Sequence, residues 1–407
     1  MALDLSKTIT QLEELTRHMS GQHDAHAAAL AAALAHLASA DPDEVEARRR
    51  AGQVTWLAAG LDPSTGSGQA LLAGAVAPAP LPPDHAVVAV DGSHIDVDRH
   101  SPVRCYLVNI GYVSLRYGEL PDAALWNTPR LFASDDDLAL RGPQGNREQA
   151  VEGPVLGMLR AVMEIEALAD LVEAVPAGLP VLALLDGSLI LWGLSGSGYP
   201  DFVRTALIDD RLLPALDRLR TLAGERTLAV ASHVSLPRST DVVSALRIAP
   251  EVCRWEAVNC DRNCGALRRG ERNCDVVAGV TDAQLFAEAL RPGERSPLYR
   301  TTSSIVEEHY GPHQVRFFYV HLGEEIARIE LPQWVGDEAL ELAHGALLAQ
   351  AAKGHGYPLA LQEAHEQAVV STSDRTHFAQ LVDELLAAEG LPATTSQKDR
   401  SKRTRFI

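Results

Sequence analysis

The chain has few cysteines, no long apolar run and no surplus of basic residues. Five cysteines among 407 residues argue against the disulfide framework of a small secreted protein. No apolar stretch reaches the ~20 residues needed to span a bilayer. The N-terminus also lacks the basic and apolar regions of a secretory signal. The sequence therefore predicts a cytoplasmic protein without a membrane segment.

The charge is acidic overall but unevenly distributed. A formal net charge of −18 argues against a general nucleic-acid coat protein. Residues 398–407, however, are rich in lysine and arginine. Such a terminal run is typical of a solvated tail, but it also offers a local patch for a polyanion. A second basic cluster consists of Arg262, Arg268, Arg269 and Arg272.

Two apolar runs end in the same triplet. Residues 87–90 lead into Asp91-Gly92-Ser93, and residues 182–185 lead into Asp186-Gly187-Ser188. Each run predicts a buried strand that delivers a carboxylate to its C-terminal end, where glycine permits a tight turn or close approach by a ligand. An Asp-Gly pair after a strand is also an ordinary turn. Two such aspartates brought together would suit a shared divalent cation, which offsets their mutual repulsion.

The order of the predicted elements indicates an α/β fold. Helices are expected within residues 5–59, followed by strands and helices around a mixed central sheet. The expected regions are an N-terminal helical region at 1–60, a linker at 61–84, a main domain at 85–390 and a basic tail at 391–407. Strands are expected at 105–114, 181–185 and 227–232 and as a hairpin at 315–320 and 325–331, and helices at 44–57, 149–173, 199–223, 281–290, 337–353, 358–369 and 375–389.

The helix between the two triplets supplies further candidates. Arg160 and Glu164 are four residues apart and share a helix face. Glu166 lies about 200° from Glu164 around the helix, so one of the two glutamates faces the site. Three carboxylates and water are ordinary ligands of Mg²⁺ or Mn²⁺. Either glutamate is also a normal solvated helix residue.

A last candidate lies near the C-terminus. Tyr357 precedes Pro358, a residue that suits the first turn of a helix, and His365 follows two turns later. A histidine at this place could bind a metal, orient water or contact a phosphate. A structural hydrogen bond is the alternative.

These residues, in this order, resemble the NurA nucleases, which act in processing DNA ends. The resemblance covers about residues 84–390. It is carried by Asp91-Gly92-Ser93, Arg160/Glu164/Glu166, Leu185-Asp186-Gly187-Ser188-Leu189 and Tyr357-Pro358…Ala364-His365.

The resemblance implies an RNase H-like domain that cleaves DNA with Mn²⁺ or Mg²⁺, as a homodimer and with a HerA-type hexameric ATPase. It implies metal ligands at Asp91, Asp186 and one glutamate, of which we favour Glu164 over Glu166. Tyr357 and His365 would complete the site. The family commonly has a Lys-Ser-type element after its third core strand, where this chain has Ser232-His233-Val234-Ser235. A basic contact from that strand is therefore not expected here.

Four of the five cysteines are crowded into an apparent insertion at about 253–275. Four thiolates within such a short segment could bind zinc or an iron–sulfur cluster, although no Cys-x-x-Cys pair is present. Four ordinary reduced cysteines are the alternative. The interleaved arginines of the second basic cluster could contact DNA phosphates. The cysteines are Cys253, Cys260, Cys264 and Cys274.

The sequence leaves three functions open. The first is a metal-dependent DNA nuclease, in double-strand break repair or related DNA processing. The second is a non-catalytic assembly factor that docks on a ring ATPase. The chain lacks a Gly-x-x-x-x-Gly-Lys-Ser/Thr loop, so it is not itself the motor. The third is a phosphoesterase acting on RNA.

Overall fold

The computed structural model describes residues 5–62, 72–98 and 103–390. By its internal contacts the chain divides into two units. Unit 1 comprises Met1–Pro78, Ser235–Ser303 and Arg316–Ile329, and unit 2 comprises Ala79–Val234, Ser304–Val315 and Glu330–Ile407. This division does not test which segments fold alone, so the domain boundaries drawn from the sequence stay a prediction. The basic tail at 391–407 lies outside the described residues, as does the middle of the expected linker.

Unit 2 contains a mixed sheet with the strand order β4-β3-β2-β7-β8. β2, β3 and β4 are antiparallel neighbours, whereas β7 and β8 run parallel to β2. This is the RNase H-like arrangement that the resemblance implies, and the expected mixed sheet flanked by helices is confirmed. The strands are β2 (His85–Ile95), β3 (Tyr106–Tyr117), β4 (Asp122–Phe132), β7 (Val181–Asp186) and β8 (Leu228–Val234).

The apolar runs read from the sequence are the buried centre of this sheet. Residues 86–90 of β2 and 181–184 of β7 are almost completely inaccessible to solvent. A central strand that is covered on both faces needs apolar side chains in both directions, which explains continuous rather than alternating hydrophobicity. By contrast, β4 lies at the end of the strand order and is exposed along nearly its whole length.

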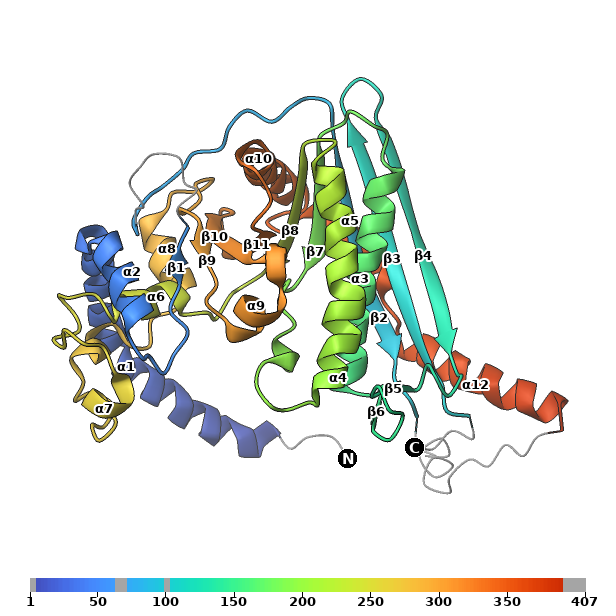
Figure 1. The fold of residues 1–407 in the computed structure, drawn as a ribbon, viewed down its shortest axis with the longest axis horizontal. Coiled ribbons are helices and arrows are strands. Elements are labelled where there is room, and N and C mark those ends of the chain that lie inside the picture. The colour runs from blue at the N-terminus through green and yellow to red at the C-terminus, as the bar shows by residue number, and fades with distance from the viewer. Residues whose placement is uncertain (1–4, 63–71, 99–102, 391–407) are drawn as a thin grey trace. The chain divides into compact units, whose positions relative to one another are not determined.

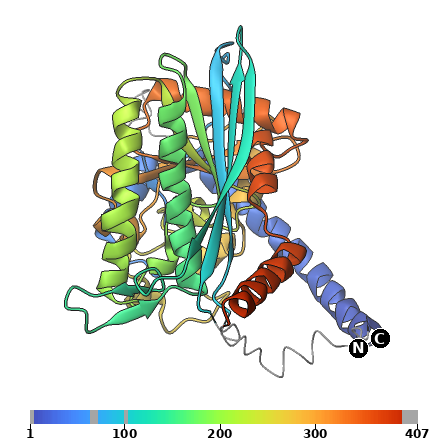
Figure 2. The ribbon, with the colours of Figure 1, turned by 90° about the vertical axis from the view of Figure 1, so that its right-hand side faces the viewer.

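Helices cover both faces of the sheet in unit 2. α3 (Pro154–Ala174) packs on β2 and β7, and α5 (Leu213–Ala223) packs against α3. α11 (Leu359–Ala368) packs on β2 and β3 from the other face. Figure 2 shows the sheet edge-on, with α3 and α5 on one side and the C-terminal helices on the other. The two faces of β2 therefore receive side chains from segments about two hundred residues apart.

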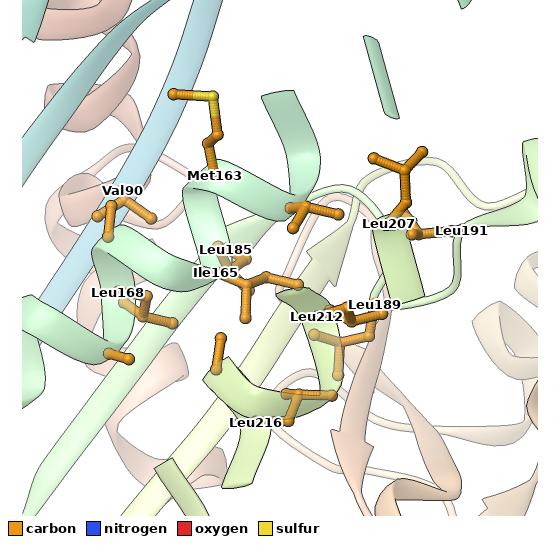
Figure 3. Packing of buried hydrophobic residues seen from close by; sticks show 14 of the residues in the cluster. Val90, Met163, Ile165, Leu168, Leu185, Leu189, Leu191, Leu207, Leu212 and Leu216 are labelled. Atoms are coloured by element: carbon orange, nitrogen blue, oxygen red, sulfur yellow. The ribbon is translucent and has the colours of Figure 1, made fainter. Parts of the chain in front are cut away.

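The core beneath α3 is aliphatic. Ile165 and Leu168 of α3 lie close to Leu185 of β7 in Figure 3, and all three are buried. Burial of each such side chain contributes about 1.5–3 kcal/mol. This packing holds α3 in a fixed rotation, which in turn decides which of its carboxylates faces the end of the sheet.

The helix predicted over 199–223 is present but not regular. It consists of α4 (Asp201–Arg204), a π-helical segment η2 (Thr205–Leu212) and α5. Pro214 has no backbone N–H, so the usual hydrogen bond to the residue four positions earlier cannot form, and a wider turn is favoured there. The remaining elements of unit 2 are β5 (Ala139–Arg141), β6 (Glu148–Ala150), η1 (Trp192–Leu194), α9 (Ser304–His309), η4 (Gly311–His313), α10 (Asp337–Lys353) and α12 (Thr372–Ala388).

Unit 1 has its own apolar core and begins with the expected helices. α1 (Leu5–Ser39) and α2 (Pro42–Ala51) form the N-terminal helical extension. The prediction that the second helix continues to residue 57 was wrong. Gly52 ends it in an extended conformation, and Gln53 forms a bridge with Asn259 instead. The other elements are β1 (Gly60–Leu61), α6 (Asp241–Leu246), α7 (Cys260–Cys264), η3 (Asn273–Val277), α8 (Asp282–Ala289), β9 (Tyr299–Arg300), β10 (Val315–His321) and β11 (Ile326–Pro332).

The described part of the chain has no helix that is both long enough and apolar enough to cross a bilayer.

Candidate active site

The two triplet aspartates lie side by side on neighbouring parallel strands. The register of β2 and β7 pairs Val90 with Leu185, so Asp91 and Asp186 are the next residues along both strands. The same row continues onto β8, where His233 is the partner of Asp186. Side chains in one such row project from the same face of the sheet. The fold therefore brings both carboxylates to one place.

The two triplets differ in local structure, which corrects the expectation that both end a strand. Asp91, Gly92 and Ser93 continue β2, because β2 keeps its antiparallel pairing with β3 as far as Ile95. The second triplet does leave its strand. Gly187 has a φ of +89°, a conformation that favours glycine.

Close approach, rather than a turn, explains the first glycine. A Cβ atom on Gly92 would lie 2.5 Å from Oε1 of Glu164 and 3.1 Å from Cγ of Arg160. Both side chains come from α3, and Glu164 is 7% exposed. Arg160 donates a hydrogen bond to the Gly92 carbonyl and forms a 3.2 Å ion pair with Glu164. The missing side chain thus makes room for the third carboxylate.

Glu166, the alternative to Glu164, points elsewhere. Arg211 of the π-helical segment donates to both of its carboxylate oxygens, at 2.8 and 2.5 Å. This bidentate pair satisfies Glu166 away from the aspartates. Of these two glutamates, Glu164 is the one that lies next to the triplets.

The serine of each triplet forms a hydrogen bond that holds the local backbone in place. Ser93 donates to the carbonyl of Ala368 at 2.6 Å, and Asn109 donates to the same carbonyl at 2.9 Å. These bonds fix the C-terminal end of α11 on β2 and β3. In the second triplet, Ser188 donates to buried Glu330 at 2.7 Å. Each serine therefore holds the backbone near its aspartate.

α11 and the turn before it complete the cluster. Nδ1 of His365 lies 2.8 Å from Oδ2 of Asp91, and the histidine ring is otherwise largely exposed. Tyr357 precedes the helix and forms a side-chain hydrogen bond with Asp186. The five residues selected from the sequence are thus brought together by β2, α3, β7, α11 and the turn before α11. They are Asp91, Glu164, Asp186, Tyr357 and His365.

The site concentrates negative charge. Burial raises the pKa of Glu164 to about 8, and repulsion from Asp91 and Asp186 adds to this effect while Arg160 opposes it. Partial burial also raises the pKa of Asp186, with Asp91 adding to the rise and the Tyr357 hydrogen bond opposing it. Neighbouring carboxylates ionise together only at a cost that a cation can offset.

A divalent cation suits the chemistry of these donors. Oε1 of Glu164 is buried and accepts no hydrogen bond from any described residue, and hard cations prefer carboxylate oxygen. Among the residues that the structure describes, however, no three or more His, Cys, Asp or Glu side chains are already arranged to hold a metal ion. The fit to a cation therefore rests on the donor set, and ligation requires adjustment of these side chains.

His233 is a residue of this region that sequence reasoning did not select. It is completely buried, and its ring meets the Tyr357 ring edge-to-face with centroids 5.1 Å apart at 86°. Burial lowers its pKa to about 4, so the imidazole is neutral. The only sequence signal at this segment is that Ser232-His233-Val234-Ser235 stands where the family commonly has a Lys-Ser-type element.

The cysteines of the insertion belong to unit 1. Cys260 and Cys264 begin and end α7, and Cys274 is buried in η3. Burial raises the pKa of the Cys260 thiol, and the other three thiols contribute to this shift. All four are free thiols, and no metal-holding group includes them within the described residues. A metal at this segment stays a prediction.

The neighbouring arginines are mostly available at the surface. Arg262, Arg268 and Arg269 are exposed, whereas Arg272 is half-buried and donates to the Leu267 carbonyl at 3.2 Å. Their role in DNA binding likewise stays a prediction.

Comparison with known proteins identifies the family. The model of the NurA domain matches residues 85–370. The NurA nuclease from Sulfolobus solfataricus is structurally similar with a TM-score of 0.49 and 13% identity, over 96% of this chain and 98% of that one. An Argonaute protein from Aquifex aeolicus gives a TM-score of 0.27 and 10% identity, over 70% of this chain and 28% of the other. No curated protein matches the sequence significantly. Because the NurA domain covers more than half of the sequence, the chain belongs to the NurA family.

Proposed function

We propose that this chain is a metal-dependent deoxyribonuclease that hydrolyses phosphodiester bonds. The observation that carries the proposal is the convergence of three carboxylates, one of them buried, on Tyr357 and His365 in a member of the NurA family. A nuclease named NurA is among the structurally similar proteins. The family and the residues thus point to the same chemistry.

Each residue has a role that follows from its surroundings. Asp91, Asp186 and Glu164 would hold Mn²⁺ or Mg²⁺. Such a cation, when bound, supplies an activated water and stabilises charge on phosphorus. Tyr357 keeps Asp186 oriented through its hydrogen bond. His365 holds Asp91 through Nδ1, and its exposed ring can give a proton to the leaving oxygen.

The proposed setting is DNA end resection in double-strand break repair, with a HerA-type hexameric ATPase and as a homodimer. The family resemblance of the sequence supports this setting. The exposed residues Leu5, Ile9, Leu12 and Leu15 form a stripe at helical spacing on α1. Exposed apolar stripes of this kind favour protein partners.

That stripe also supports the second candidate, a non-catalytic assembly factor. An end-labelled DNA cleavage assay with Mn²⁺ or Mg²⁺ separates the two functions. Glu164→Gln and Glu166→Gln form a matched pair in this assay, because they lie two residues apart and only Glu164 faces the aspartates. We expect loss of cleavage in the first variant and retention in the second. Absence of cleavage by the wild-type protein with either metal would favour the assembly role.

Substrate class is tested in the same assay. Unlabelled RNA, single-stranded DNA and duplex DNA are added as competitors to the labelled DNA. A DNA nuclease is inhibited by DNA, whereas stronger inhibition by RNA would favour an RNA phosphoesterase.

We also propose that the cysteines of the insertion bind zinc or an iron–sulfur cluster. Their concentration in one segment and their mutual proximity around Cys260 support this proposal. Elemental analysis of anaerobically purified protein should detect zinc or iron in the wild type and a loss in Cys260→Ser. Protein with neither metal would exclude the site.

A further inference from the structure

His233 lies on β8 next to Asp186 in the same row of residues. The proposed chemistry does not use its side chain. Its side chain is completely buried, so it cannot reach a phosphate in solvent. Neither ring nitrogen has a hydrogen-bond partner among the described residues. Burying an imidazole without a hydrogen bond costs folding free energy. The packing of the ring, and not a polar contact, must therefore account for His233 at this position.

The contacts of His233 lead to Asp186 by two routes. Its carbonyl oxygen accepts a hydrogen bond from the Gly187 backbone N–H at 2.9 Å. The same N–H also donates to Oδ1 of Asp186 at 3.0 Å. The second route runs through the ring, which packs edge-to-face against Tyr357, whose hydroxyl bonds Asp186. The backbone hydrogen bond holds the turn at Gly187. The ring contact with Tyr357 acts on the Asp186 carboxylate.

We propose that His233 is a positioning residue whose ring holds Tyr357 in the orientation that bonds Asp186. An edge-to-face contact restricts a phenol ring more than aliphatic packing does, because the ring quadrupoles favour one arrangement. The role depends on the shape of the ring and not on its nitrogen atoms. A phenyl ring should therefore replace the imidazole without loss, since no hydrogen bond within the described structure is broken. The consequence for catalysis rests on the proposed function, whereas the contact itself does not.

The test follows Tyr357 directly. The full-length protein is labelled with 3-fluorotyrosine, and the Tyr357 signal among the eight tyrosines is assigned by its loss in Tyr357→Phe. In metal-free His233→Ala we expect this ¹⁹F signal to shift and broaden. In His233→Phe we expect a single ordered signal and a thermal midpoint at or above that of the wild type.

Mn²⁺ binding without DNA gives a second readout. His233→Ala should weaken Mn²⁺ affinity about tenfold, as is usual when a partner of a ligand is lost, and His233→Phe should restore it. In the Tyr357→Phe background, His233→Ala should weaken binding no further, because both changes remove the same hydrogen bond. If His233→Ala does not fold, His233→Val takes its place.

An unchanged Tyr357 signal in His233→Ala would overturn the proposal, and so would failure of His233→Phe to restore order or additive effects of the two changes on Mn²⁺ affinity. These outcomes differ from failure of the proposed function. If the wild type neither binds Mn²⁺ nor cleaves DNA, the ¹⁹F signals still decide whether His233 orients Tyr357.

Discussion

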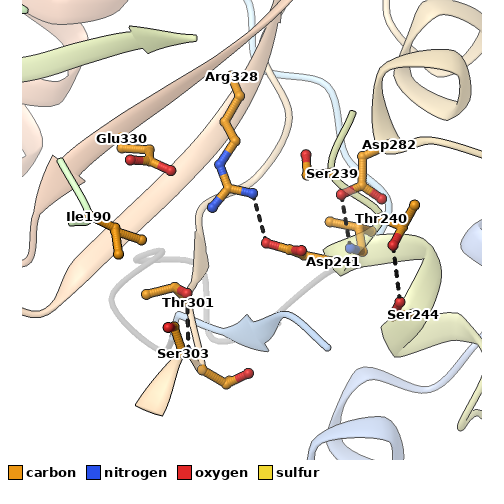
Figure 4. A network of polar contacts seen from close by, with 12 residues as sticks. Ile190, Ser239, Thr240, Asp241, Ser244, Asp282, Thr301, Ser303, Arg328 and Glu330 are labelled. Atoms are coloured by element: carbon orange, nitrogen blue, oxygen red, sulfur yellow. Dashed lines mark hydrogen bonds and ion pairs between the residues drawn. The ribbon is translucent and has the colours of Figure 1, made fainter. Parts of the chain in front are cut away.

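Each unit contains a group of carboxylates near one arginine, and the two groups are satisfied very differently. Both carboxylates of the unit 1 group are buried, whereas in unit 2 only Glu164 is buried. In unit 1, Asp282 accepts hydrogen bonds from the Tyr319 hydroxyl at 2.7 Å and from the backbone N–H groups of Val242 and Val243. Asp241 pairs with buried Arg328 at 2.7 Å, as Figure 4 shows. This network ties α6 and α8 to the adjoining strands.

In unit 2, Oε1 of Glu164 forms a 3.2 Å ion pair with Arg160 but accepts no hydrogen bond in the described structure. It also faces the repulsion of two aspartates. Buried polar groups in native proteins nearly always form hydrogen bonds. A buried carboxylate oxygen without one therefore indicates a functional role rather than a stabilising one. The comparison therefore distinguishes a structural carboxylate from a candidate catalytic one by hydrogen-bond satisfaction, because Asp282 and Glu164 are both buried.

The largest expected effect is on the unit 2 group. Asp186→Asn removes a proposed ligand with little change of volume, so we expect cleavage of end-labelled DNA with Mn²⁺ to fall about a thousandfold or more. Circular dichroism and the thermal midpoint should stay near the wild-type values. Asp170→Asn is the matched control, because that carboxylate is exposed on α3 and pairs with Arg218. Substantial cleavage by Asp186→Asn would remove Asp186 from the mechanism.

The reciprocal change in unit 1 should affect stability instead. Asp241→Ala takes the carboxylate away from Arg328, which is 3% exposed, and loss of one partner of a buried pair costs about 3 kcal/mol or more. We expect the free energy of unfolding in urea to fall by this amount. Cleavage per folded molecule should be unchanged. A specific loss of cleavage that exceeds the unfolded fraction would show that the two groups are not separate in role.

The pH dependence of stability should have the same sign for the buried carboxylates of both units. In the metal-free protein, Glu164 keeps its proton up to about pH 8, whereas the unfolded chain loses it near the ordinary value of 4.5. Glu164 therefore contributes stability at low pH that is lost as the pH rises through about 8, by at most about 5 kcal/mol. Burial likewise raises the pKa of Asp282, so its contribution is also lost with rising pH.

Mn²⁺ distinguishes the two contributions. Urea unfolding at several pH values should show a smaller loss with rising pH when Mn²⁺ is present, because a cation favours ionised Glu164. Glu164→Gln should remove this metal effect, and Glu166→Gln should keep it. If Mn²⁺ left the pH profile of the wild type unchanged, the carboxylates of unit 2 would not be its binding site.

The sequence predicts much of this fold because burial leaves a pattern. The continuous apolar runs before Asp91 and Asp186 identify the central strands, and the strand order then places the two aspartates together. Exposed β4 leaves little such pattern. A strand without a buried face has no apolar alternation to detect.

The site itself was predictable where its residues are close in sequence or share a motif. The choice between Glu164 and Glu166 needed the rotation of α3, which long-range packing decides. His233 could not be chosen from the sequence, because its role depends on strand register with Asp186 and on contact with Tyr357, far along the chain. A single histidine near the end of a strand does not reveal which residues it will contact in the fold.

The smallest expected effects come from two glycine substitutions, one that crowds Glu164 and one that only changes helix propensity on α3. Gly92→Ala places a Cβ atom 2.5 Å from Oε1 of Glu164, so the carboxylate must move and cleavage should fall about tenfold. Stability should fall by only about 1–2 kcal/mol, because the strand geometry at residue 92 suits alanine.

Gly157→Ala on α3 is the control, since a Cβ there meets no atom within 4 Å. It should stabilise the protein by about 0.5–1 kcal/mol through helix propensity and leave cleavage unchanged. Equal cleavage by the two variants would mean that the space left by Gly92 does not serve Glu164. The contrast between a crowded candidate catalytic group in unit 2 and a fully bonded structural one in unit 1 would then lose its geometric basis.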